Sequence, residues 1–223
     1  MTLSATRPFR AGLLLATTVL TLAGGPAFPA PPGSRAEALA GLADADATTR
    51  AEAIVWVAEH GTMNDADLLH LRLRDDSPIV RAFAEQGLWR LWSRSGDPEI
   101  DRLMDRGSEA MQAGRQDEAI AIFTGVIRRR PDFAEGWNKR ATALFLAGEY
   151  RRSAQDCEEV FKRNPRHFGA LSGNGQNWIQ LEHLENALRF LRRALEVNPN
   201  MAGIELQIRA LEALQRRQRG NAT

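Results

Sequence analysis

Three prolines, Pro131, Pro165 and Pro199, are equally spaced along the chain, and each follows an amphipathic stretch. Proline lacks an amide hydrogen and restricts the residue before it, so it ends a helix rather than continuing one. Helices that end at the same point in every period indicate an internal repeat of helix pairs. The spacing therefore predicts an all-α solenoid and leaves little room for strands.

Small residues recur at the same interval, both inside the predicted helices and in the turns between them. They are Gly107, Ala141 and Gly175; Ala119, Ser153 and Ala187; and, in the turns, Gly114 and Gly148. Small side chains at fixed places let two helices approach closely, while larger ones fill the space between them.

This pattern resembles the tetratricopeptide repeat, a unit of about 34 residues, in three copies at 100–133, 134–167 and 168–201. The family motif has an early aromatic residue, a small residue, a glycine turn, another small residue, a bulky apolar residue and a final proline. The second copy supplies Trp137, Ala141, Gly148, Tyr150 and Pro165. The first copy has Leu103 at the aromatic position, and the third departs from the motif with Glu182 at the glycine turn.

The resemblance implies a right-handed α-solenoid of three helix pairs over residues 98–217. We expect its helices at 98–112 with 117–129, 134–146 with 150–163, and 168–180 with 184–196. Residues 202–217 place apolar side chains on one stripe and are predicted to form the helix that caps the array. Residues 218–223 are left as a tail.

A second repeat, with a slightly shorter period, lies upstream in 31–97. Leu42, Asp44 and Arg50 align with Leu73, Asp75 and Arg81 in acidic turns that precede alanine-rich stretches. This arrangement resembles HEAT-type helical repeats and implies helices at 35–43, 47–60, 65–73 and 78–93. We expect Trp89 and Trp92 to pack in the core where the two segments meet.

Residues 1–30 are predicted to be a signal peptide. Arg7 and Arg10 precede an apolar run at 11–25, and small residues follow at a plausible cleavage site. The alternative is an uncleaved anchor in the inner membrane, although the run is shorter than the roughly 20 apolar residues of a spanning helix. The sequence thus predicts a periplasmic protein that has no stable membrane insertion once the signal is removed.

A longer similarity agrees with this compartment. The stretches LWSRSG, DRLMDRG, PDFAEGWNKRAT and PRHFGALSG, within residues 88–201, resemble a group of small exported tetratricopeptide proteins of proteobacteria. That resemblance implies the fold and the cellular compartment, but it does not imply a biochemical mechanism.

Charge argues against a nucleic-acid partner. The chain has 29 basic and 28 acidic residues, and the predicted signal peptide removes two arginines, so no basic excess remains. Cys157 is the only cysteine, which excludes an intramolecular disulfide and suggests a small buried side chain.

No catalytic motif stands out. The four histidines form no HExxH or CxxC-linked set, and there is no GxSxG elbow. His167 is expected to make a capping hydrogen bond, and Gly173 and Gly175 to allow close helix packing. We therefore expect a non-enzymatic protein without metal or cofactor.

The family resemblance places a binding groove on the first helix of each pair. The candidate groove residues are Ser108, Met111, Gln112, Asn138, Lys139, Thr142, Phe145, Gln176, Ile179 and Gln180. Their mixed polar and apolar character suits an extended peptide or a helix. Only Asn138 and Lys139 resemble the residues with which chaperone-binding arrays clamp a carboxylate.

These observations predict an adaptor or scaffold that binds a protein or peptide partner of the cell envelope, in an oligomeric state that the sequence leaves open. Two alternatives remain: a holder of an exported client such as an apocytochrome, and an enzyme or small-ligand carrier with its site at the junction of the two segments. Basic clusters on the second helices, at 128–130, 151–152, 162–163 and 192–193, are expected to form a solvated face or, less simply, a docking surface.

Overall fold

A computed structural model describes residues 31–220, and all regular secondary structure in that range is helical, including one turn of 3-10 helix at Met63–Asp65. The predicted signal peptide and the last three residues lie outside the described residues. The helices are α1 (Arg35–Gly41), α2 (Ala47–His60), α3 (Ala66–Arg72), α4 (Pro78–Ser93), α5 (Pro98–Gln112), α6 (Gln116–Arg129), α7 (Ala134–Leu146), α8 (Tyr150–Arg163), α9 (Phe168–Gln180), α10 (Leu184–Val197) and α11 (Ala202–Gly220). The all-α fold class is thus confirmed, and most helix bounds match the sequence prediction closely.

Local signals start and stop these helices. Asp97 caps α5 by accepting a hydrogen bond from the amide of Glu99, and Pro98 occupies the first turn, where no amide hydrogen is needed. α6, α8 and α10 each end just before a proline of the periodic series. The prolines therefore set the period of the array through elementary backbone sterics.

The turn within each of the three pairs has the same conformation. Gly114, Gly148 and Glu182 have φ angles of 73°, 79° and 61°, and the amides around each bond the last carbonyls of the preceding helix. In the third turn the amide of Glu182 bonds the carbonyl of Ile179, as the amide of Gly148 bonds that of Phe145. The departure from the glycine motif at Glu182 therefore leaves the turn geometry unchanged and forces a side chain into left-handed backbone.

The periodic small residues hold the paired helices close together. A β-carbon built at Gly107 would lie 2.5 Å from the ring of Phe123, and one at Gly175 would lie 2.6 Å from Leu191. Ser153 Oγ donates a 2.8 Å hydrogen bond to the carbonyl of Ala141, which joins α8 to α7. The predicted role of these positions in close packing is confirmed.

The upstream segment repeats a hydrogen-bond pattern at its own period. Arg50 donates to the carbonyls of Asp44 and Ala45, and Arg81 donates to the carbonyls of Asp75 and Asp76, the equivalent positions one period later. Arg50 also forms a two-pronged ion pair with the Asp75 carboxylate, at 2.7 and 2.9 Å. Each arginine thus stabilises the turn before its helix by hydrogen bonds to the carbonyls of that turn. Arg50 also links one helix pair to the next. The HEAT-like character of 31–97 stays a prediction.

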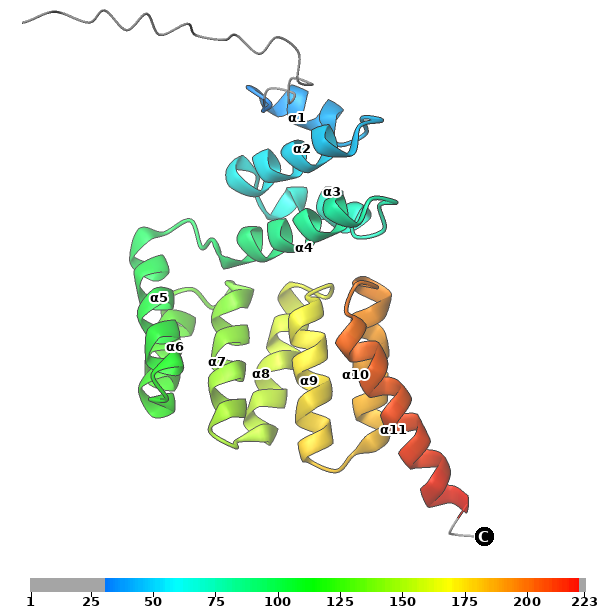
Figure 1. Ribbon diagram of the computed structural model, residues 1–223. Helices are drawn as coiled ribbons and strands as arrows, with labels where there is room; N and C mark the ends of the chain where they lie inside the picture. Colours follow the sequence, from blue (N-terminus) through cyan, green and yellow to red (C-terminus); the bar gives the residue numbers. More distant parts are fainter. Residues whose placement is uncertain (1–30, 221–223) are drawn as a thin grey trace, which may run out of the picture.

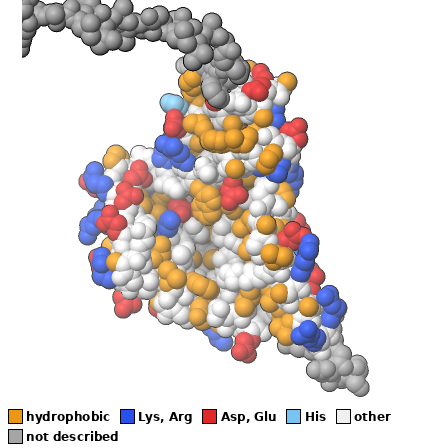
Figure 2. Space-filling view, in the orientation of Figure 1, with side chains coloured by type: hydrophobic (Ala, Val, Ile, Leu, Met, Phe, Trp, Pro, Cys, Tyr) orange, Lys and Arg blue, Asp and Glu red, His pale blue; other side chains and the backbone are white. Residues whose placement is uncertain are grey.

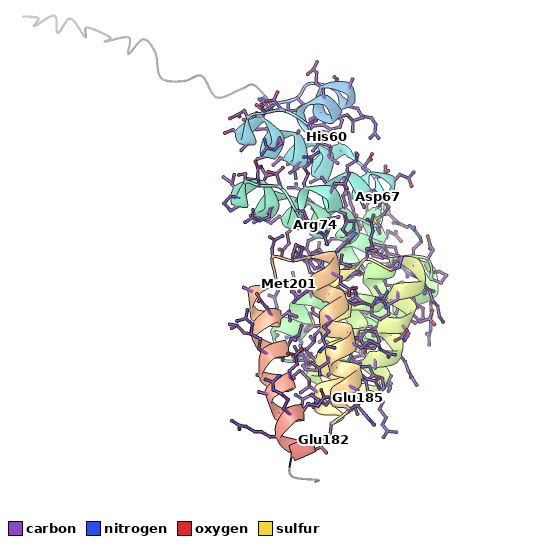
Figure 3. All side chains as sticks on the ribbon, turned by 90° about the vertical axis from the view of Figure 1, so that its right-hand side faces the viewer. His60, Asp67, Arg74, Glu182, Glu185 and Met201 are labelled. Carbon is purple, nitrogen blue, oxygen red and sulfur yellow. The ribbon has the colours of Figure 1, made fainter. Side chains whose placement is uncertain are left out.

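The two segments do not continue as one straight stack. α4 runs across the ends of α7, α8, α9 and α10 instead of lying alongside them (Figure 1). Figure 3 places Asp67, Arg74 and Met201 in this contact zone. Arg74 donates to the carbonyl of Glu196, Arg166 pairs with Asp67, and the amide side chain of Asn200 donates to the carbonyl of Leu73 at 2.8 Å.

Aromatic side chains form the centre of this contact. The ring of Trp92 stacks on that of His167 with centroids 4.2 Å apart, and Trp89 and Trp92 both contact Phe168. Trp92 is 3% exposed and Phe168 is 1% exposed, so the junction is part of the core. The predicted place of the two tryptophans is confirmed.

Among residues 31–220, no helix combines the length and hydropathy that crossing a membrane requires.

Candidate functional site

The first helices of the second and third pairs, α7 and α9, border a small hollow whose lining contains four of the predicted groove residues. Its volume is about 110 Å³. The lining consists of Asn138, Ala141, Thr142, Phe145, Ser153, Cys157, Gly169, Ala170, Gly173 and Gln176. The structure therefore brings Asn138, Thr142 and Phe145 of the second repeat together with Gln176 of the third.

Gly173, on α9, gives the hollow an open wall. A β-carbon at Gly173 would meet no atom within 4 Å, whereas one at the neighbouring Gly175 would clash with Leu191. The expectation that both glycines serve helix packing is therefore wrong for Gly173. The reason is helical phase, since two residues turn the chain by about 200° and place the two positions on opposite faces.

The amide of Asn138 is held at the inner edge of the hollow. Its Nδ2 atom donates to both carboxylate oxygens of Glu135, at 3.2 and 3.1 Å, and Glu135 is 1% exposed. An ionised carboxylate only accepts hydrogen bonds, so the nitrogen of the amide must face it. The orientation of the Asn138 amide is therefore fixed, and at least one of its two N–H donors is taken up by Glu135.

Glu135 connects this edge to the aromatic junction. His167 Nε2 lies 3.0 Å from the Glu135 carboxylate, and His167 Nδ1 accepts a 3.1 Å hydrogen bond from the amide of Ala170. The predicted capping role of His167 is confirmed by this second bond. Because His167 also stacks on Trp92, the position of Asn138 is tied through two side chains to the N-terminal segment.

Thr142 and Phe145 form the outer wall on α7. Thr142 is exposed, and its Oγ1 donates to the carbonyl of Asn138 at 3.0 Å. The Phe145 ring is partly exposed and contacts the edge of Tyr150, with centroids 5.3 Å apart. An aromatic surface beside a hydroxyl can hold an apolar side chain of a bound segment.

The capping helix limits the hollow at the third pair. Gln176 exchanges two hydrogen bonds with Gln207 of α11, at 2.6 and 3.0 Å. Ile179 packs against the apolar cluster of α10 and α11 that includes Ile208, which leaves only Gln180 exposed at that end. Ile179, an apolar member of the predicted groove, is thus partly covered by the chain itself.

The remaining predicted groove residues lie outside the hollow. On α5, Ser108 bonds the carbonyl of Met104 and Met111 packs against the core of the first pair, while Gln112 is exposed. Lys139 is turned toward Glu135, with its Nζ atom 3.8 Å from the carboxylate. The first pair therefore contributes no residue to the hollow.

Cys157 lines the hollow, but its thiol is expected to be unreactive. It is 2% exposed, and burial together with the nearby Asp156 and Glu158 raises the pKa of its thiol well above the ordinary range. A protonated thiol is a poor nucleophile and a poor metal ligand. Within residues 31–220, no three or more His, Cys, Asp or Glu side chains gather in a way that could hold a metal ion.

Sequence reasoning did not anticipate Glu135 or Gly169 at this site. Glu135 looks like an ordinary acid in the first turn of a helix, and only the approach of the distant His167 marks it as buried. Gly169 faces the hollow on one side, yet a β-carbon there would lie 2.2 Å from the Trp89 ring. Neither the burial of Glu135 nor the contact of Gly169 with Trp89 produces a periodic pattern in the sequence.

The basic clusters on the second helices are largely paired or exposed. Arg152 pairs with Glu149, Lys162 with Glu159, and Arg192 with Glu212, all with the basic side chain more than half exposed. Exposed pairs of this kind contribute little to stability. Their arrangement agrees with a solvated face.

Comparisons with known proteins point to one family. Residues 104–165 match the tetratricopeptide repeat family. A TPR repeat-containing protein of Rhizobium etli is 37% identical over 108 residues, which are 48% of this chain and 53% of that protein. The chain thus spans about half the length of this relative.

Solved structures agree. The first TPR domain of Spaghetti, solved bound to the HSP90 peptide SRMEEVD, aligns with a TM-score of 0.51 at 25% identity, over 52% of this chain and 92% of that one. The Sgt2 TPR domain of Aspergillus fumigatus aligns with a TM-score of 0.52 at 20% identity, over 57% and 84% of the two chains, and shows the fold alone. Residues 104–165 are therefore similar to the tetratricopeptide repeat family, and the helix pairs of α5 to α10 have the fold of its arrays.

Proposed function

We propose that this protein is a non-catalytic interaction module that binds a polypeptide segment across α7 and α9, at the hollow lined by Asn138, Thr142, Phe145 and Gly173. The observation that carries the proposal is the open wall at Gly173 opposite the partly exposed Phe145 ring. A segment lying there meets exposed backbone on one side and an aromatic surface on the other. That combination suits a main chain with one apolar side chain.

The chemistry of the hollow favours the interior of a peptide over its terminal carboxylate. The NH₂ group of Asn138 and the ammonium group of Lys139 both face the buried Glu135, which already supplies a carboxylate to them and disfavours a second one. The peptide complex of the Spaghetti domain supports polypeptide binding by this fold. The partner proposed here is a protein segment of the cell envelope whose contact residues are internal and at least partly apolar.

Filling the hollow tests the proposal. Peptides selected by display on the purified protein are titrated by calorimetry against the wild type and Gly173→Phe. The new ring enters open space and replaces the peptide, so we expect at least a tenfold loss of affinity, or about 1.4 kcal/mol. Phe145→Ala, which removes the aromatic wall, should weaken the same peptides.

The matched control is Gly125→Phe. Gly125 also lies in a helix, α6, and a β-carbon there meets nothing within 4 Å, but it is remote from the hollow. This variant should bind like the wild type. Equal affinity for the Gly173→Phe and Gly125→Phe proteins would place the peptide elsewhere and refute the assignment. No Asn138 variant is included, because replacing Asn138 would also remove a hydrogen-bond donor from the buried Glu135.

We further propose that the protein works in the periplasm, delivered by the predicted signal peptide at residues 1–30. Fusion of residues 1–35 to alkaline phosphatase, which folds only after export, should give an active enzyme. N-terminal sequencing of the mature protein then separates cleavage from anchoring. A fusion that remains inactive in the cytoplasm contradicts this placement, whatever the outcome of the peptide titrations.

A further inference from the structure

The junction between the two segments contains a second cavity, distinct from the hollow on α7 and α9. Its volume is about 230 Å³. Four stretches of chain supply its lining: Met63; Trp92, Arg94 and Ser95; Arg130, Asp132, Phe133 and Ala134; and Arg163 and Asn164. The N-terminal segment and the repeat array therefore build it together.

Positive charge dominates the lining. Arg94, Arg130 and Arg163 line the cavity, and the single acid, Asp132, is already bound by Arg130 through two hydrogen bonds of 3.1 and 3.0 Å. Arg94 donates only to the carbonyls of Glu59 and Ala58, so its charge is not neutralised by any acid of the described residues. Arg163 pairs with Glu159 through its Nη1 group, at 2.7 Å, and leaves its Nη2 group without a hydrogen-bond acceptor among those residues.

Two residues of the lining each carry a donor that has no acceptor. Trp92 Nε1 and Asn164 Nδ2 are buried and make no hydrogen bond to any described residue. Trp92 is 3% exposed and Asn164 is 7% exposed. A buried donor without an acceptor has lost its bonds to water and gained none in return, so two at one cavity call for an occupant that supplies acceptors.

The rest of the lining is apolar. Met63, Phe133, Ala134 and the ring of Trp92 contribute hydrocarbon surface. A space of this size corresponds to about eight water molecules, each taking roughly 30 Å³. It therefore suits a ligand of at least that many non-hydrogen atoms, which has an acceptor group at one end and a short apolar body at the other.

We propose that this cavity binds a carboxylate carried on a short aliphatic or branched apolar body. The carboxylate meets the unpaired donors and the charge of Arg94, and the body lies against Phe133 and Trp92. A small free carboxylic acid and the C-terminal residue of a polypeptide share this chemistry. Because both segments line the cavity, its ligand also holds them together.

The probes are hexanoate, as a free acid, and N-acetyl-leucine, as a mimic of a C-terminal residue. Hexanamide and N-acetyl-leucinamide are the matched neutral controls. Binding is followed in the full protein through the indole N–H signal of Trp92 in ¹H–¹⁵N NMR spectra, assigned with Trp92→Phe. We expect both acids, or one of them, to move this signal downfield with saturation, since an acceptor lengthens the N–H bond. The amides should bind at least tenfold more weakly.

The two acids separate the sources of the ligand. Tighter binding of hexanoate favours a free acid, and tighter binding of N-acetyl-leucine favours a chain terminus. Arg94→Gln should reduce affinity for the preferred acid at least fivefold, and Ala134→Leu, which fills the cavity and keeps every arginine, should abolish binding. Arg90→Gln, on the same side of the molecule but outside the lining, is the control.

Two results would overturn the proposal. The first is an indole signal that neither acid moves, and the second is equal binding of acids and amides. Neither of these results affects the proposal for the hollow at Gly173, which is tested separately by the peptide titrations.

Discussion

His167 Nε2 donates a 3.0 Å hydrogen bond to the carboxylate of Glu135, and neither side chain is more than 1% exposed. The direction of the bond follows from the other ring nitrogen, because Nδ1 accepts from the amide of Ala170 and so leaves the proton on Nε2. The pair joins the start of α7 to the turn before α9, and the ring of His167 carries the connection on to Trp92. One buried contact thus fixes the groove edge and the junction at once.

Removing the acceptor of this pair should destabilise the protein strongly. Glu135→Ala leaves the donors of His167 and Asn138 buried without a partner, and we expect a loss of about 3 kcal/mol in the free energy of unfolding. Glu135→Gln should lose less, since its carbonyl can still accept from His167 while its NH₂ group faces that of Asn138. Urea unfolding followed by circular dichroism measures both; a Glu135→Ala protein as stable as the wild type contradicts the role given to this pair.

Acid should weaken the protein through His70. Burial, and then the nearby His167 and Arg74, lower the pKa of His70 from 6.5 to about 4. The unfolded chain therefore takes up a proton near pH 6.5 that the folded protein refuses until about pH 4, so stability is lost as the pH falls through that window. His70→Leu cannot take up this proton and should lose less stability than the wild type between about pH 7 and about pH 4.5. Parallel pH profiles for the two proteins would rule His70 out as the cause.

Close packing between α5 and α6 can be tested at one glycine. Gly107→Ala places a methyl group 2.5 Å from the Phe123 ring, which is fully buried and cannot move freely. We expect a loss of about 1–3 kcal/mol from overpacking. Gly125→Ala, in open space on α6, should instead gain roughly 0.5–1 kcal/mol, because alanine favours a helix over glycine. The opposite signs, read from urea midpoints, distinguish packing from helix propensity.

The third turn offers a stabilising substitution. Glu182 is an exposed side chain at a φ of 61°, and Figure 3 places it at the end of the array away from the N-terminal helices. Glu182→Gly relieves the left-handed strain and should raise stability by up to about 1 kcal/mol, partly offset by the greater entropy of the unfolded chain. Gly148→Ala, the reverse change in the second turn, should lower it. A loss of stability in Glu182→Gly would mean that the glutamate side chain makes a contact that outweighs the strain.

Surface chemistry gives little guidance to function by itself. Figure 2 shows acidic, basic and hydrophobic side chains interspersed over one face, with hydrophobic ones gathered over α2 and α4. The two proposed sites are instead marked by residues whose polar atoms lack a hydrogen-bond partner, Trp92 and Asn164, or whose surroundings are open, Gly173.

The sequence by itself determined the helices and their pairing. Pro131, Pro165 and Pro199 end helices through local sterics. The glycine turns and the small residues that recur at the same period also act over a short stretch of chain. These features can therefore be recognised in the sequence alone. Even the third turn, where Glu182 breaks the motif, kept its shape, because the packing of Gly175 against Leu191 holds α9 and α10 in the same relation as the other pairs.

Only the tertiary structure decided how the two segments meet and which groove positions stay open. The contact of Asn200 with Leu73 joins residues 127 positions apart, and no period of the sequence relates them. α11 covers Ile179, and Glu135 becomes a buried acceptor, for the same physical reason. Each of these three contacts forms between side chains that become neighbours only when the helices stack. The order of residues along the chain does not show which of them will become neighbours.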